Sequence, residues 1–201
     1  MKVLCAAIGL LIITHPVAAQ DTCPTRADLN DGTRLTDARA GYARVFVERD
    51  DGLYEGSTDG IEGPLTGVWW FRPHPILPGT RATQDGLFDM AYDSDVADID
   101  LLPAGATWTS AVTHLSDGKT HSTGSVEVYA GGPFPLSPHR LGDCAYDILA
   151  FRISKHIEGA GSLYDEVYFA PQLGLVIGAT HLDVLGAPRG AFWFDQIARD
   201  R

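Results

Sequence analysis

The sequence predicts an all-β protein, built as a single antiparallel sheet that curls into a barrel or half-barrel, with little helix outside the N-terminal segment. Three observations lead to this fold class. Short runs rich in β-branched and aromatic residues recur along the chain, turn-forming residues separate them, and no convincing amphipathic helix lies between them. Such spacing favours antiparallel strands. A β-sandwich is the alternative arrangement.

The N-terminal segment, residues 1–19, has the three parts of a secretory signal peptide. Lys2 supplies the positive charge, residues 4–13 form the apolar run, and residues 17–19 form a small-residue cleavage site. The apolar run is too short to span a bilayer, which needs about 20 residues. We therefore expect cleavage after Ala19, no transmembrane segment in what remains, and one exported β-rich domain over residues 20–201, periplasmic or secreted.

The first half of that domain contains several strand-like runs. Residues 20–40 are polar, with a turn signal at 30–32 and room for one short helical turn. The proline-rich segment 73–78 is excluded from an interior strand because proline lacks the amide donor. The expected strand-like runs are residues 42–49, 53–57, 68–72, 87–92 and 99–102.

The second half gives the clearest hairpin, residues 108–115 and 120–129, joined through Ser116-Asp117-Gly118-Lys119. A loop rich in glycine and proline follows at 131–138. The remaining strands are expected as a meander at 144–154, 163–169, 175–184 and 190–197.

Cysteine usage agrees with export. Cys5 is lost with the signal peptide, so Cys23 and Cys144 remain as a pair, and an oxidising compartment favours a disulfide between them. This bond closes a loop of about 120 residues, which the chain-entropy treatment values at about 4–5 kcal/mol.

Charge and motif content narrow the function classes. The chain of 201 residues has 15 Lys and Arg against 26 Asp and Glu, a net charge of −11, and this acidity argues against a nucleic-acid partner. No G-x-S-x-G, H-E-x-x-H, G-x-G-x-x-G, Walker loop or C-x-x-C is present. The sequence gives no reason to predict a cofactor and no positive reason to predict an enzyme.

Two histidines flank the central turn. If Asp117 and Gly118 form a two-residue loop, His114 lies opposite His121 with about 5 Å between their Cβ atoms, close enough to share a metal ion. A three-residue loop with a bulge separates them. Two ligands fall short of the usual three or four. We therefore predict no metal site and regard an exposed polar pair as the simpler interpretation.

Aromatic residues lie on or beside most expected strands. Because alternate residues of a strand point to opposite faces, Phe192 and Phe194 share one face while Trp193 takes the other, and Trp69 and Trp70 also point apart. If both faces carry bulky apolar groups, one forms the core and the other is covered or binds a ligand. An ordinary two-sided core is the competing interpretation. The candidate ligand-binding residues are Trp69, Trp70, Phe192 and Phe194.

The C-terminal segment 168–176, Tyr-Phe-Ala-Pro-Gln-Leu-Gly-Leu-Val, resembles a hairpin of uncharacterised exported bacterial β-proteins, in which a strand entry like Gly142-Asp143-Cys144 precedes it. Some of those families are similar in outline to the LolA-like lipoprotein-carrier half-barrels. The resemblance covers about residues 142–182. It implies a curved sheet with an apolar groove and carries over no catalytic residue.

These observations favour an exported, non-enzymatic β-protein that binds an apolar small molecule or lipid, or an envelope protein. One alternative is a hydrolase or metal-dependent enzyme using scattered residues such as His114, His121 and Asp147. A structural or assembly factor without a ligand is the other.

Overall fold

The structure of the protein is a computed structural model, which describes residues 23–50, 52–58, 69–83 and 86–199. The predicted signal peptide, residues 1–19, and its cleavage site lie outside these ranges. Within them, no helix is long and apolar enough to cross a membrane.

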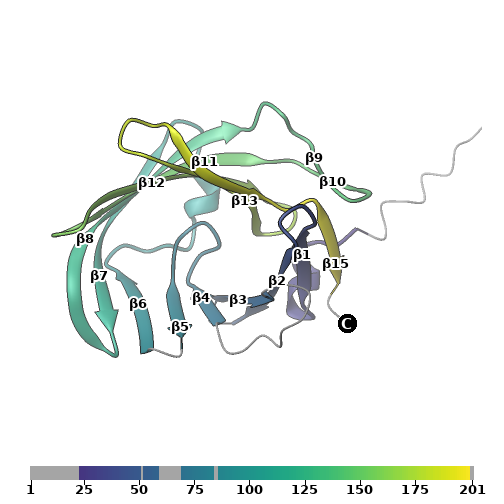
Figure 1. Cartoon of the computed structure of the whole chain (residues 1–201). Coiled ribbons are helices and arrows are strands. Elements are labelled where there is room, and N and C mark those ends of the chain that lie inside the picture. Colours follow the sequence, from purple (N-terminus) through teal and green to yellow (C-terminus); the bar gives the residue numbers. More distant parts are fainter. Residues whose placement is uncertain (1–22, 51, 59–68, 84–85, 200–201) are drawn as a thin grey trace, which may run out of the picture.

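The described residues form an all-β fold, which confirms the predicted fold class (Figure 1). Thirteen of their strands make one antiparallel sheet, β9 and β10 pair separately, and η2 and η3 are short 3-10 helices. The elements are η2 (Arg26–Asn30), β1 (Thr33–Asp37), β2 (Tyr42–Arg49), β3 (Gly52–Thr58), β4 (Trp69–Arg72), β5 (Thr80–Thr83), β6 (Gly86–Tyr92), η3 (Ile99–Leu101), β7 (Thr107–Ser116), β8 (Lys119–Pro133), β9 (His139–Leu141), β10 (Cys144–Tyr146), β11 (Leu149–Ile157), β12 (Gly161–Ala170), β13 (Leu175–Leu182), β14 (Pro188–Trp193) and β15 (Gln196–Arg199).

Neighbours in the sheet are almost always neighbours in sequence. The strand order is β14-β13-β12-β11-β8-β7-β6-β5-β4-β3-β2-β1-β15, so the chain meanders and the β9–β10 pair is inserted between β8 and β11. The sheet curls around an interior, with β11–β13 facing β1–β5 across it (Figure 1). Strong twist is how a sheet of this width buries one face on itself.

The two strands at the ends of this order, β14 and β15, are consecutive in the chain. Between them, the Phe194 amide donates to the Ile177 carbonyl of β13 at 3.0 Å, and the Asp195 amide donates to the Thr36 carbonyl of β1 at 2.9 Å. The same segment therefore hydrogen-bonds both margins of the sheet. The sequence predicts one strand over 190–197. In the structure the chain changes its partner strand at residues 194 and 195, from β13 to β1.

The proline-rich segment 73–78 enters the interior instead of crossing the surface. His74, Ile76 and Leu77 are all buried, and Ile76 and Leu77 pack with Ile99, Val126 and Phe151. Figure 1 shows the loop between β4 and β5 standing within the curve of the sheet. The segment thus fills part of the space that the curled sheet encloses.

Several predicted elements differ from the structure for identifiable reasons. The strand expected at residues 99–102 is instead η3 (Ile99–Leu101), because the run is short and the Leu101 amide closes a turn onto the Asp98 carbonyl at 3.1 Å. Residues 144–154 divide into β10 and β11. Residues 131–133, expected in a loop, extend β8 opposite β11. The strands β1, β5 and β9 were not predicted, since each is short and rich in polar residues.

The Cys23–Cys144 disulfide predicted from the cysteine count is present in the structure, with 5.6 Å between the two Cα atoms. Cys144 lies in β10 and is buried among Leu29, Tyr146 and Leu173. The Tyr146 hydroxyl donates to the Pro24 carbonyl at 2.8 Å, beside the disulfide. The N-terminal segment is therefore attached covalently and by a hydrogen bond to the β9–β10 pair.

Candidate functional site

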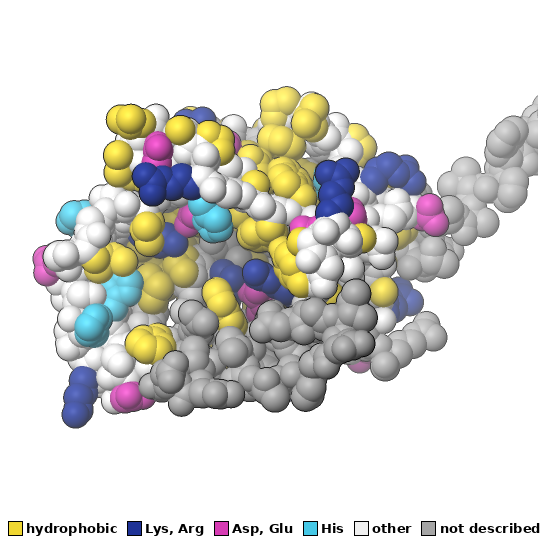
Figure 2. All heavy atoms as spheres, in the orientation of Figure 1, with side chains coloured by type: hydrophobic (Ala, Val, Ile, Leu, Met, Phe, Trp, Pro, Cys, Tyr) yellow, Lys and Arg dark blue, Asp and Glu magenta, His cyan; other side chains and the backbone are white. Residues whose placement is uncertain are grey.

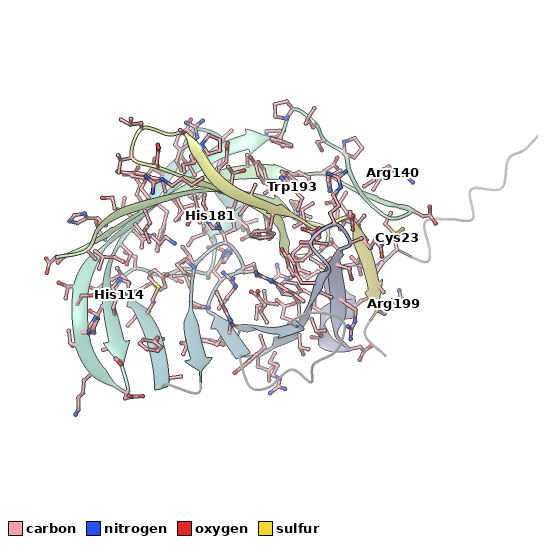
Figure 3. All side chains as sticks on the ribbon, viewed as in Figure 1. Cys23, His114, Arg140, His181, Trp193 and Arg199 are labelled. Atoms are coloured by element: carbon pink, nitrogen blue, oxygen red, sulfur yellow. A yellow bond between two sulfur atoms is a disulfide. The ribbon has the colours of Figure 1, made fainter. Side chains whose placement is uncertain are left out.

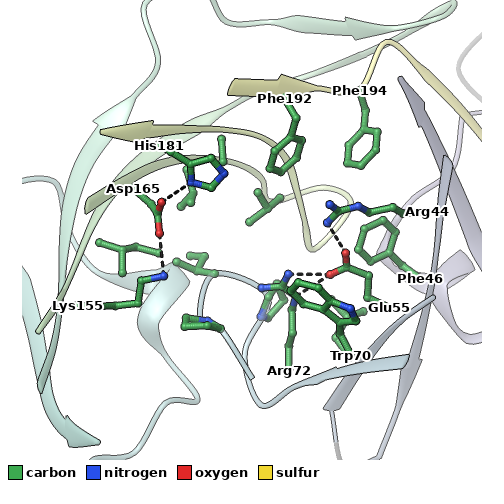
Figure 4. A pocket seen from close by; sticks show the side chains of 18 residues that line it. Arg44, Phe46, Glu55, Trp70, Arg72, Lys155, Asp165, His181, Phe192 and Phe194 are labelled. Carbon is green, nitrogen blue, oxygen red and sulfur yellow. Dashed lines mark hydrogen bonds and ion pairs between the residues drawn. The ribbon is translucent and has the colours of Figure 1, made fainter. Parts of the chain in front are cut away.

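The interior of the curled sheet contains a cavity of about 240 Å³ (Figure 4). Six strands each contribute two lining residues two positions apart, one of them apolar and the other charged or ionisable. These pairs are Arg44 and Phe46, Leu53 and Glu55, Trp70 and Arg72, Ile153 and Lys155, Asp165 and Val167, and Ala179 and His181. This spacing follows from the two-residue period of a strand, which directs alternate side chains to the same face.

Glu55 of β3 forms the more buried of two ionic clusters in the wall. Its side chain is 2% exposed, and it pairs with Arg44 on one neighbouring strand and Arg72 on the other. The Arg72 Nε donates to Glu55 Oε2 at 2.8 Å, and the Arg72 Nη1 donates to the Leu77 carbonyl at 3.1 Å. The Arg44 Nη1 donates to Glu55 Oε1. Glu55 is therefore held between two guanidinium groups.

Burial alone would raise the pKa of Glu55, because it disfavours the charged carboxylate. The charges and hydrogen bonds of Arg72 and Arg44 outweigh that effect and hold the pKa of Glu55 below its ordinary value. The cluster is thus two cations around one carboxylate.

Lys155, Asp165 and His181 form the second cluster, across the cavity (Figure 4). The Lys155 Nζ lies 2.9 Å from Asp165 Oδ2, and the His181 Nδ1 lies 2.6 Å from Asp165 Oδ1. Asp165 and His181 are register partners on β12 and β13. Burial would raise the pKa of Asp165, but Lys155 and the His181 hydrogen bond lower it below its ordinary value. His181 is 59% exposed and connects this cluster to solvent.

Three of the four predicted ligand-binding aromatics lie on this cavity: Trp70, Phe192 and Phe194. The side chain of the fourth, Trp69, lies outside the described residues. Trp193 points away from the cavity and stacks on Tyr168, with 4.3 Å between ring centroids, as expected from strand alternation (Figure 3). That these aromatic residues bind a ligand stays a prediction.

The Arg44 guanidinium lies among aromatic rings. Its Cζ is 5.2 Å from the Phe192 centroid, 5.6 Å from that of Tyr42 and 6.0 Å from that of Trp70. Arg72 also lies over Trp70, at 5.6 Å. Contacts of cations with ring faces at these distances are attractive, so the aromatic lining and the cations form one surface.

The charged lining residues were not identified from the sequence. Each sits in a strand where a polar residue at alternate positions is ordinarily read as facing solvent. One pattern in the sequence could have identified them: a charged or ionisable residue stands two positions from an apolar residue on six strands. This pattern indicates an interior site only when the sheet is known to curl, because the curl places both residues of each pair inside.

The two predicted histidines lie elsewhere, at a second hollow of about 520 Å³ beside β6, β7, β8 and the β11–β12 turn. Asp117 and Gly118 form the two-residue turn, but a bulge after His114 places Ser122 opposite it, where an unbroken register would place His121. Burial lowers the pKa of His114, as do the charges of His121 and Lys155. In the part of the chain that the structure describes, no three His, Cys, Asp or Glu side chains gather to hold a metal.

Asp147, the third residue of the enzyme alternative, is exposed after β10. It accepts hydrogen bonds from the Ser137 hydroxyl at 3.3 Å and the Gln172 amide at 3.1 Å. His114 lies on β7, and the lining residues of its hollow do not include Asp147. The described structure therefore does not bring the three residues of that alternative into one site.

Comparison with known proteins bears on the fold. The sequence matches no protein-family model and no curated protein. Among solved structures, the chain is similar to the hypothetical lipoprotein YmcC from Escherichia coli K12, with a TM-score of 0.50 and 9% sequence identity, over 90% of this chain and 92% of that one. At this identity the likeness shows a shared fold alone.

Proposed function

We propose that the protein is an exported, non-enzymatic binding protein that takes a small, largely apolar molecule into the cavity of the curled sheet. The observation that carries the proposal is the cavity itself, in which Trp70, Phe192 and Phe194 join aliphatic side chains around an interior space. Its volume of about 240 Å³ is slightly below the roughly 300–1,000 Å³ of common small-molecule sites. A small ligand fits this space better than a whole lipid.

Two features support export. The predicted signal peptide addresses the chain out of the cytoplasm. The Cys23–Cys144 disulfide is of the kind that persists in oxidising compartments and is rare in reducing ones.

Binding is favoured over hydrolysis by the chemistry of the lining. The His181–Asp165 hydrogen bond resembles the contact by which a carboxylate orients the histidine of a catalytic triad, but a triad also needs a nucleophile within hydrogen-bond reach of that histidine. None of the described side chains that line the cavity is Ser, Thr or Cys. The cavity thus has the pattern of a binding site, apolar walls with a few polar groups.

The first test is native mass spectrometry of residues 20–201 purified from the periplasm, followed by extraction and identification of bound molecules. We expect a one-to-one complex with an apolar molecule, or uptake of an added apolar fluorescent probe by the bare protein. The variant Val176→Trp places an indole in the cavity and should abolish uptake. Val184→Trp, at a side chain 71% exposed between β13 and β14, is the matched control. Equal binding by both variants, or no uptake by the wild-type protein, would overturn the proposal.

A further inference from the structure

The cavity carries more positive than negative charge, although the chain as a whole is acidic. Arg44, Arg72 and Lys155 face Glu55 and Asp165, which leaves one positive charge in excess, and a second when His181 is protonated. The net charge of the chain is −11. Figure 2 shows basic and acidic side chains within the hollow at the middle of this face. A positive interior in an acidic protein attracts an anion locally.

The two arginines differ in how fully their donors are used. Arg72 places its donors on Glu55 and on the Leu77 carbonyl. Arg44 gives its Nη1 to Glu55, while its buried Nε has no hydrogen-bond partner. A buried donor without an acceptor is unfavourable. Among the described cations in the wall, Arg44 is therefore the one with a buried donor that lacks a hydrogen-bond partner.

Apolar surface adjoins this guanidinium. Phe192 and Trp70 flank Arg44, and Phe46 and Phe194 line the same end of the cavity (Figure 4). A ligand with its anionic group at Arg44 would thus place the apolar rest of the molecule against aromatic and aliphatic side chains. At about 30 Å³ per water-sized group, 240 Å³ holds about eight such groups, which matches a short alkyl chain.

We propose that the ligand is a small acidic amphiphile, a carboxylate or phosphate ester with a short alkyl chain, whose acidic group is held by Arg44. This assignment rests on the proposed binding function and specifies the chemistry of the ligand. Lys155, across the cavity, adds a second positive charge that favours the same class. Removing Lys155 weakens binding less than removing Arg44.

Isothermal titration of the full exported chain with octanoate, octyl phosphate, octanol and octylamine tests the ligand class without any mutation. We expect an acidic compound to bind at least about tenfold more tightly than octanol, because a hydrogen bond to a charged group contributes about that much. The tighter of the two acids identifies the head group. Equal binding of octanol and both acids would overturn the inference and leave the proposed function standing. Absence of binding by all four would count against both.

Three variants test the position of the acidic group, each checked for native circular dichroism. Arg44→Gln should remove the preference for the acid over octanol, and Lys155→Gln should only reduce it. Arg152→Gln, three residues from Lys155 on β11 but exposed, is the matched control and should preserve it. A preference that survives Arg44→Gln and disappears in Lys155→Gln would overturn the assignment to Arg44.

Discussion

The two ionic clusters of the cavity have similar composition and different surroundings. Each holds one carboxylate between two basic side chains on adjacent strands. Glu55 is 2% exposed and lies between two guanidinium groups, whereas Asp165 is 14% exposed and one of its partners, His181, faces solvent. Buried ion pairs become strongly destabilising when one member is removed, and exposed pairs contribute little. The two clusters therefore differ in burial more than in composition, and we expect the loss of Glu55 to cost more stability than the loss of Asp165.

The largest effect is expected for Glu55→Gln. This change leaves Arg44 and Arg72 close together without a carboxylate between them, so the free energy of unfolding should fall by about 3 kcal/mol. Urea denaturation measures it. Glu127→Gln, at an exposed position on β8, is the control and should change stability by less than about 0.5 kcal/mol. If the two variants were equally stable, the carboxylate of Glu55 would not be needed to stabilise Arg44 and Arg72.

Acid should destabilise the protein through both carboxylates. Their pKa values are lowered in the folded protein, so the stability they add is present above the ordinary values of 4.5 for Glu55 and 3.8 for Asp165, and it is lost as the pH falls below them. Each group can add a slope of up to about 1.4 kcal/mol per pH unit. Urea denaturation between about pH 6 and about pH 3 should therefore show a shallower acid slope for Glu55→Gln than for the wild type. An unchanged slope would remove Glu55 from the acid response.

The smallest effect is expected for Asp165→Asn. The asparagine still bonds to Lys155 or His181, and solvent compensates for the lost charge, so stability should fall by about 1 kcal/mol. The same urea measurement compares it directly with Glu55→Gln. A loss as large as that of Glu55→Gln would show that the two clusters are equivalent, against the difference in their burial.

The strands that were predicted from the sequence are those where β-branched, aliphatic and aromatic residues recur. Residues 108–115 and 120–129 are rich in Thr, Val and aromatics and appear as β7 and β8. β1, with the sequence Thr-Arg-Leu-Thr-Asp, was missed because its polar residues resemble a loop. Its side chains at alternate positions are nevertheless buried, because that face of the strand points into the core, and β2 and β15 flank it in the sheet. Tertiary pairing, which a local pattern does not contain, decides such short strands.

The aromatic residues of the candidate site could be predicted from the sequence, but its charged residues could not. Trp70, Phe192 and Phe194 were identified because large aromatics on a strand need a partner surface. Arg44 and Glu55 were not, because two residues in separate strands become an ion pair only when β2 and β3 align. The bulge beside His114 is a further example, since the turn residues predicted the hairpin correctly and still left the histidine register undetermined.

The segment around Phe194 and Asp195 imposes an order on biosynthesis. A ribosome, or an export channel, releases the chain from its N-terminal end, and until residues 188–199 emerge neither margin of the sheet has its last strand. Contacts between β1 and β15 join residues more than 150 positions apart, from Thr33 to Arg199, and such distant pairings are slow to form. The cavity can therefore be completed only after residues 188–199 have emerged, and until then the apolar side chains of its lining lack the strands that close the curled sheet.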